Sequence, residues 1–335
     1  MQEKNIQTMR RLVLVSILLA ILVVSLGAYT RLTHAGLGCP DWPGCYGLID
    51  VPESAEQIAK AEQAFPERPV EPEKAWNEMI HRYFAGSLGL LILAISILAW
   101  RLRSHGTPFK LPLLILAVVV FQAALGMWTV TMMLMPIVVM GHLLGGFMTL
   151  CLLFLLYLRL KVYRVPGGDV RLRSTAKLGI IGIFILTTQI ALGGWTSSNY
   201  AALVCVELPI CQSGWVESLT FENSFDAIPP KRDTYEFGHL DHDERVTIHV
   251  AHRIGAIITA CYLFWLMVRV FRRAESHFFK QTSLLLGLVL TIQVLLGVSN
   301  IWFSLPLAVA VSHNVVAACL MLVLIKLTYS LSRKI

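Results

Sequence analysis

Four histidines occur in this chain as two pairs related by one fixed offset. His81 and His252 are 171 residues apart, and His142 and His313 are also 171 residues apart. Neutral imidazole is a common ligand of metals and of heme iron. Two histidines in each half of a duplicated chain therefore predict two metal or heme centres, one per half. The same offset relates Gln122 to Gln293 and Gly126 to Gly297.

The elements that hold these histidines are expected to be membrane helices. The chain has 335 residues, of which 56% are hydrophobic and only 15% are charged, whereas a soluble domain has about 25% charged residues. Runs of about 20 apolar residues, enough to span a bilayer, occur near 12–30, 79–100, 111–132, 136–159, 176–198, 246–270, 282–304 and 306–329. The sequence thus predicts an all-α polytopic membrane protein with eight transmembrane helices.

The charges of the chain indicate its topology. Its formal net charge is +7, which by itself could suggest binding to nucleic acid. Lysine and arginine, however, cluster in one set of connections, whereas two long loops, 31–78 and 199–245, are rich in aspartate and glutamate. By the positive-inside rule both termini are cytoplasmic and both long loops lie outside. We therefore expect a multi-pass protein of the bacterial cell inner membrane, and no nucleic-acid partner.

The repeat also predicts the domain organisation. Residues 1–160 form an N-terminal half of four helices with outer loop 31–78, residues 161–177 a cytoplasmic linker, and residues 178–335 a C-terminal half with outer loop 199–245. Because each half has an even number of spans, both cross the membrane in the same direction. Two four-helix bundles related by a pseudo-twofold axis along the membrane normal are expected. Residues 53–64 favour a short surface helix.

Two cysteine pairs with equal spacing lie in the outer loops. Cys39 and Cys45 are in the first loop and Cys205 and Cys211 in the second, each pair six residues apart. The two pairs are 166 residues apart, so equivalent residues differ by 166 up to this part of the second outer loop and by 171 from the following helix onward. On the oxidising side of a membrane such pairs are candidate disulfides. Unpaired thiols are the alternative interpretation.

All four histidines are expected at one depth, one to two helical turns below the outer surface. Each pair would then lie on different helices at a common level, as ligation of a flat macrocycle by two histidines requires. Heme is favoured over zinc or copper because the spans contain no carboxylate or thiol cluster that would complete a tetrahedral site. Hydrogen-bonding histidines are the alternative. Small residues, among them Gly145 and Gly255, would let a ring approach the helices.

An arginine follows one histidine of each pair. Arg82 and Arg253 are placed to form bidentate hydrogen bonds with heme propionates near the outer interface. The alternative is that both side chains extend towards lipid headgroups.

The two halves differ beside these histidines. Glu78 lies three residues before His81, and the equivalent residue of the second half is His249. At this spacing both side chains share a helix face with the proposed ligand. A carboxylate beside one centre can move protons, so we interpret the N-terminal half as the site of chemistry and the C-terminal half as the holder of a permanent redox cofactor. Two alternatives stay open. Glu78 could be a simple interfacial charge, and His249 could be the ligand in place of His252.

Several motifs together resemble those of the heme A synthase family, and the resemblance covers nearly the whole chain. They are Tyr29-Thr30-Arg31-Leu32-Thr33, Gly36-Leu37-Gly38-Cys39-Pro40-Asp41-Trp42-Pro43-Gly44-Cys45, the stretch from Glu78 to Arg82, Gly141-His142, His252-Arg253 and Ser312-His313. The resemblance implies an oxidoreductase that converts the C8 methyl group of heme O to the formyl group of heme A by successive hydroxylations, with electrons passed to a bound heme b.

The resemblance also implies roles for individual residues. His81 and His142 would bind the iron of the substrate heme, His252 and His313 the iron of heme b, and Glu78 would be the catalytic carboxylate. The family's outer-loop cysteines correspond to Cys39–Cys45 and Cys205–Cys211. Heme O synthase, an oxidase-assembly factor and an electron acceptor are the partners implied, and a homo-oligomer is compatible with the sequence.

Two other functions would use the same four histidines. One is a diheme b-type electron-transfer protein of the membrane, against which the difference between Glu78 and His249 argues. The other is a heme-binding carrier without chemistry. Formation of a formylated heme by the purified protein distinguishes the enzyme from both.

Overall fold

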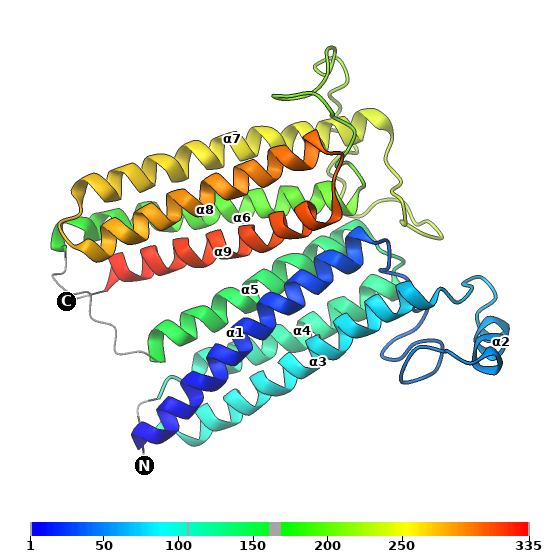
Figure 1. Cartoon of the computed structure of the whole chain (residues 1–335), viewed down its shortest axis with the longest axis horizontal. Coiled ribbons are helices and arrows are strands. Elements are labelled where there is room, and N and C mark those ends of the chain that lie inside the picture. Colours follow the sequence, from blue (N-terminus) through cyan, green and yellow to red (C-terminus); the bar gives the residue numbers. More distant parts are fainter. Residues whose placement is uncertain (1, 106, 161–168, 334–335) are drawn as a thin grey trace. The chain divides into compact units, whose positions relative to one another are not determined.

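The regular structure of this protein is helical throughout the part that the computed structural model describes, residues 2–105, 107–160 and 169–333. Eight long helices follow one another along the chain (Figure 1). They are α1 (Gln2–Leu32), α3 (Pro72–Arg101), α4 (Lys110–Thr131), α5 (Pro136–Leu160), α6 (Ala176–Ser198), α7 (His242–Arg273), α8 (His277–Trp302) and α9 (Leu307–Ser332). All eight are long and apolar enough to cross a membrane, which confirms the prediction of an all-α polytopic membrane protein.

Several helices begin earlier than their apolar runs, and in α3 and α7 the added residues form a polar, capped first turn. Helix α3 begins at Pro72, seven residues before the predicted start at 79, and α7 begins at His242 instead of 246. Proline at the first helical position and an Asp241–Glu244 capping box stabilise these polar first turns. The hydropathy pattern could not show them, because it reports only the part of a helix that is apolar.

A short helix in the first outer loop confirms a smaller prediction. Helix α2 (Ala55–Ala64) lies within the predicted range 53–64. Its capping box is reciprocal, since Gln57 donates its backbone N–H to the Ser54 hydroxyl and accepts the Ser54 N–H. The remaining short elements are the 3-10 helices η1 (Arg103–His105) and η2 (Val170–Thr175).

The chain forms two compact units. The first contains Met1–Leu156 and Ala227–His239, and the second contains Tyr157–Asp226 and Leu240–Ile335. Of the expected linker 161–177, residues 161–168 lie outside the described residues, and the remainder forms η2 and the start of α6. The pseudo-twofold relation between the halves stays a prediction.

Each unit contains four long helices. In the first unit α1 packs on α3 and α3 on α4. His142 of α5 contacts α4 at Gly126, and Gly146 of α5 approaches Val24 of α1. In the second unit α6 packs on α7, α7 on α8, α8 on α9, and α9 on α6. Sites for cofactors are commonly built in the core of such bundles.

The second outer loop contributes one segment to the first unit. Tyr235 of this segment donates its backbone N–H to the carbonyl of Met133, at 3.0 Å, in the turn between α4 and α5. Its side chain is 5% exposed and packs with Leu125, Met135 and Val138. Sequence alone had placed the whole loop 199–245 with the C-terminal half, because nothing in its composition indicates where the segment packs.

Replacing Tyr235 by alanine should release this segment from the first unit. Loss of a buried aromatic side chain costs about 3 kcal/mol or more, so the exposed residues Lys231 and Arg232 should become more accessible to trypsin. Cleavage after these residues, followed by mass spectrometry of the purified protein, is expected to accelerate at least tenfold. Phe221→Ala, which alters a 65% exposed side chain in the same loop, is the control. Equal cleavage rates in Tyr235→Ala and Phe221→Ala would contradict the role given to Tyr235.

Candidate functional site

In the first unit each of the two histidines lies against a glycine of a neighbouring helix. A Cβ atom added to Gly27 of α1 would stand 3.0 Å from Cε1 of His81, which belongs to α3. A Cβ atom added to Gly126 of α4 would stand 3.3 Å from Cε1 of His142, which belongs to α5. The missing side chains thus leave the space that each imidazole ring fills.

The second unit repeats this arrangement with its own residues. A Cβ atom on Gly193 of α6 would lie 3.0 Å from Cε1 of His252, and one on Gly297 of α8 would lie 3.1 Å from Cε1 of His313. The equivalence of Gly126 and Gly297 can be read from the sequence. Their contact with the histidine rings can be read only from the structure. The recurrence of glycine at equivalent positions was the available signal.

The two rings of the first unit are separated by the distance that a shared metal requires. The ring centroids of His81 and His142 are 6.4 Å apart, and the planes are inclined by 84°. Two metal–nitrogen bonds of about 2 Å each, with each ring centre about 1 Å behind its nitrogen, give a centroid separation of about 6 Å. The distance therefore fits two imidazoles that would hold one heme iron.

The surroundings of the rings favour the tautomer that a metal ligand needs. A ligating histidine usually binds the metal with one nitrogen and donates the other N–H to a carbonyl or carboxylate. The buried Nδ1 atoms of His81, His142 and His313 lack a full hydrogen bond within the described structure. The backbones of Val23, Gln122 and Gln293 lie beside these three rings. Carbonyl acceptors are thus close to nitrogens that still need them.

Two glycines expected to admit a heme ring are covered by glutamines instead. A Cβ atom on Gly145 would lie 1.8 Å from Nε2 of Gln122, and one on Gly255 would lie 2.4 Å from Oε1 of Gln189. The space beside these glycines is therefore filled by amide side chains. Within the described residues, moreover, no group of three or more His, Cys, Asp or Glu side chains could hold a metal ion. This donor set suits paired axial ligation and not a tetrahedral zinc or copper site.

Above each pair of histidines the structure places a disulfide loop. Cys39 is bonded to Cys45, and Cys205 to Cys211. The first disulfide packs on Ala75 and Met79 of α3. The second packs on Val246 and Val250 of α7, the equivalent positions. Each loop is therefore attached to the outer turns of the helix that carries His81 or His252.

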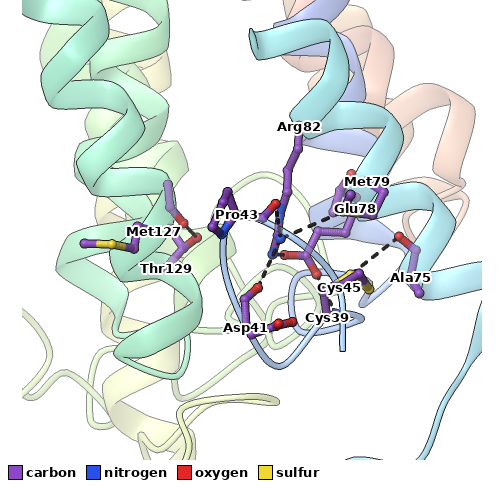
Figure 2. Close-up of polar contacts among 12 residues, drawn as sticks. Cys39, Asp41, Pro43, Cys45, Ala75, Glu78, Met79, Arg82, Met127 and Thr129 are labelled. Carbon is purple, nitrogen blue, oxygen red and sulfur yellow. Dashed lines mark hydrogen bonds and ion pairs between the residues drawn. A yellow bond between two sulfur atoms is a disulfide. The ribbon is translucent and has the colours of Figure 1, made fainter. Parts of the chain in front are cut away.

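An arginine fixes the first of these loops to its helix. Nη1 of Arg82 donates to the carbonyl oxygens of Asp41, Pro43 and Gly44 at 3.0, 3.2 and 2.5 Å. Figure 2 shows the guanidinium reaching from α3 into the curve of the loop. Several carbonyl dipoles pointing at one cation stabilise a conformation that the short loop would not hold alone.

Arg253 does the same in the second unit. It donates to the carbonyl oxygens of Glu207, Ile210 and Cys205, the first two of which are equivalent to Asp41 and Gly44. The sequence suggested heme propionates as partners of both arginines, and that role stays a prediction. The contacts with the loops were not foreseen, because the partners are carbonyls more than 35 residues away in sequence.

Glu78 is buried beneath the first loop, where both of its carboxylate oxygens are engaged. Glu78 is only 5% exposed. Oε2 accepts the backbone N–H of Cys39 at 3.0 Å, and Oε1 pairs with Nη2 of Arg82 at 2.5 Å (Figure 2). The carboxylate is thus held one helical turn from His81, on the same face of α3. Such fixation suits a group that acts at a defined position.

His249 occupies the equivalent place in the second unit but forms the opposite kind of contact. It is 4% exposed, and its Nδ1 lies 2.7 Å from the carbonyl oxygen of Ala201. An imidazole N–H therefore meets a carbonyl where the first unit has a carboxylate that accepts an N–H. This difference replaces a charged pair by a neutral hydrogen bond. His252 and not His249 repeats the contact of His81 with a glycine.

The loop can approach Glu78 only because Gly38 has no side chain. A Cβ atom at this residue would lie 2.5 Å and 2.6 Å from the carbonyl carbon and oxygen of Lys74. Backbone atoms of a helix cannot move aside as a flexible side chain can. Gly38→Ala should therefore displace the loop from α3 and weaken the Cys39–Glu78 hydrogen bond, at a cost of about 1–3 kcal/mol.

Chemical modification measures this displacement. With mild reductant, Cys39 and Cys45 of Gly38→Ala are expected to be alkylated at least fivefold faster than in the unaltered protein. Gly36→Ala is the matched control, because its Cβ would meet only the flexible end of Leu134, at 3.1 Å. If both variants react at the unaltered rate, the loop does not depend on its close approach to α3.

The chain is similar to known proteins along nearly its whole length. Residues 10–325 match the COX15-CtaA family model, described as cytochrome oxidase assembly protein. The chain is 52% identical to a heme A synthase of Shewanella oneidensis over 96% of both chains. It is 26% identical to a heme A synthase of Chelativorans sp. over 88% of this chain and 83% of that one. A heme A synthase of Bacillus licheniformis is 23% identical over 88% and 86%.

Proposed function

The chain belongs to the COX15-CtaA family of cytochrome oxidase assembly proteins, and we propose that it functions as a heme A synthase by holding its substrate between His81 and His142. As a heme A synthase it is a membrane oxidoreductase of heme A biosynthesis. The reaction inferred from this resemblance is oxidation of the C8 methyl group of heme O to the formyl group of heme A by successive hydroxylations.

One observation supports the substrate site above all. The ring centroids of His81 and His142 are 6.4 Å apart, and a buried carboxylate, Glu78, lies one helical turn from His81. A methyl carbon loses hydrogen in each hydroxylation, so a group that holds or moves a proton is needed near it. Glu78 is the carboxylate that the first unit has there and the second unit lacks. We therefore assign the chemistry to the first unit.

The pair His252 and His313 is the site we assign to heme b. Both rings repeat the contacts with glycine seen in the first unit, and the residue equivalent to Glu78 is His249. When bound, heme b supplies a centre that accepts electrons one at a time. His252 and His313 would hold it, while His249 stays bound to the carbonyl of Ala201.

Glu78→Gln tests the catalytic assignment. The amide keeps the size of the side chain and can still accept the Cys39 N–H, but it cannot take up a proton as a carboxylate does. We expect conversion of heme O to fall by about 100-fold or more, the usual contribution of general acid–base catalysis, with heme content unchanged. Product is measured by chromatography and mass spectrometry of extracted heme.

Glu73→Gln is the control for this variant, since Glu73 is an exposed carboxylate of the same helix. Unaltered activity of Glu78→Gln would show that the carboxylate does no chemistry. Loss of bound heme together with activity would instead identify Glu78 as a purely structural residue.

Separate alanine variants of the two pairs test which heme each holds. His252→Ala should remove the resident b-type heme, measured as the pyridine hemochrome of the protein as purified. His81→Ala should leave that signal in place and lose binding of added heme O, because its ring belongs to the other unit. The assignment is wrong if His81→Ala abolishes the resident heme and His252→Ala retains it.

Location and partners follow from the same assignment. We place the protein in the bacterial inner membrane with both termini in the cytoplasm, as the distribution of Lys and Arg predicts. Both heme sites then lie near the outer surface. Heme O synthase as supplier of substrate, an oxidase-assembly factor and an electron acceptor are the proposed partners.

A further inference from the structure

Gln189 is a partly buried amide that contacts one of the four histidines and has no counterpart in the first unit. It lies on α6, one helical turn before Gly193, the glycine that faces His252. Its Nε2 atom is 3.0 Å from Nδ1 of His252 and 3.0 Å from the carbonyl oxygen of His252. The position equivalent to Gln189 in the first unit is Val23, whose side chain can form no hydrogen bond.

A second difference between the halves makes room for this amide. Gly255, three residues after His252, is so close that a Cβ atom there would lie 2.4 Å from Oε1 of Gln189. The equivalent residue in the first unit is Phe84. Gln189 and Gly255 thus replace Val23 and Phe84 together. Two matched changes around one ring indicate that the contact is a built feature of the second unit.

The free oxygen of this amide is the third observation. Oε1 of Gln189 is buried without a hydrogen-bond partner in the described structure. If iron binds Nε2 of His252, the proton of the neutral ring is on Nδ1 and must be donated to an acceptor. The amide carbonyl of Gln189 is that acceptor once the terminal amide turns about its last bond. The turn exchanges the donation from Nε2 to the carbonyl of His252 for acceptance of Nδ1–H by Oε1. It needs no rearrangement of the helices, because the oxygen and nitrogen of an amide occupy nearly the same space.

From this geometry we propose that Gln189 is a positioning residue that sets the ligand strength of His252 and thereby the reduction potential of the heme held in the second unit. The inference rests on the assignment of heme b to His252 and His313. A stronger acceptor on Nδ1–H makes the imidazole a better electron donor, which stabilises ferric over ferrous iron and lowers the potential. In the first unit the backbone of Val23 lies beside His81.

Two substitutions should move the potential in opposite directions. Gln189→Glu places a carboxylate against Nδ1–H and lowers the potential. Gln189→Val, which introduces the residue of the first unit, removes the side-chain acceptor and raises it. We expect each change to alter the ratio of oxidised to reduced heme about tenfold, which is about 59 mV for one electron. The probe is an optical redox titration of the resident b-type heme in the purified full-length protein.

Thr188→Val is the matched control, because Thr188 is the exposed neighbour on α6 and donates only to the carbonyl of Phe184. Its potential should equal that of the unaltered protein. Electron paramagnetic resonance of the ferric heme is the second measurement, and the g values should shift in the two Gln189 variants alone.

The outcomes separate this inference from the proposed function. A resident heme whose potential and g values are unchanged in both Gln189 variants would overturn the inference and leave the function standing. Shifts equal to those of Thr188→Val would also overturn it. If Gln189→Val binds no heme, the potential of Gln189→Glu still tests the inference, since glutamate keeps the shape of the side chain. An unchanged potential in Gln189→Glu would then overturn it. Absence of a b-type heme from the unaltered protein would contradict the proposed function itself.

Discussion

The contact between a histidine ring and a glycine of the adjacent helix is the constraint on which the rest of each bundle depends. An imidazole that enters the interface of two helices needs backbone without a side chain opposite it, and four glycines provide this at nearly the same distance, 3.0 to 3.3 Å from Cε1 to the missing Cβ. The contact fixes both the height and the orientation of the ring. It also places the ring beside the residue one turn before the glycine, where an acceptor for the second ring nitrogen lies. A larger residue at any of the four positions would force helices apart or turn the ring, and in either case two rings could no longer share one iron.

Duplication built one scaffold twice, and substitutions beside the histidines then separated the uses of the two copies. The scaffold is the same down to the arginine that holds each disulfide loop, since Arg82 and Arg253 donate to carbonyls at equivalent loop positions. The differences lie next to the rings. The first unit has Glu78 and Val23, so a carboxylate is present and the backbone of Val23 lies beside one ring. The second has His249 and Gln189, so that carboxylate is absent and an amide is added. This difference is the one expected if, as proposed, one unit holds a substrate that reacts and the other a cofactor that stays.

Much of the fold could be predicted from the sequence because hydropathy and repetition are local or additive signals. Eight apolar runs gave eight helices, and equal cysteine spacing in the outer loops anticipated two disulfides. The contacts of the site were harder to predict from the sequence. Whether a glycine such as Gly27 faces a ring or merely lets helices pack depends on the rotation of two helices about their axes, which periodicity does not determine. The loop contacts of Arg82 were not predictable for another reason, since a backbone carbonyl has no sequence signature. Docking of Tyr235 on the first unit likewise depends on a loop path that only the folded chain defines.

The charges around the two arginines give the two units different electrostatic character. In the first unit the Arg82 guanidinium is paired with the Glu78 carboxylate at 2.5 Å, so the pair is neutral as a whole. In the second unit the described contacts of Arg253 are with carbonyl oxygens, and the residue in the place of the carboxylate forms a neutral hydrogen bond with Ala201. A positive charge that is balanced only by dipoles favours the reduced form of a nearby redox centre, because reduction adds negative charge. Since Arg253 directly follows His252, this sign is the one that the heme proposed for the second unit would require as an electron acceptor. On the proposed assignment, the exchange of Glu78 for His249 between the units separates a proton acceptor from an electron acceptor at one position.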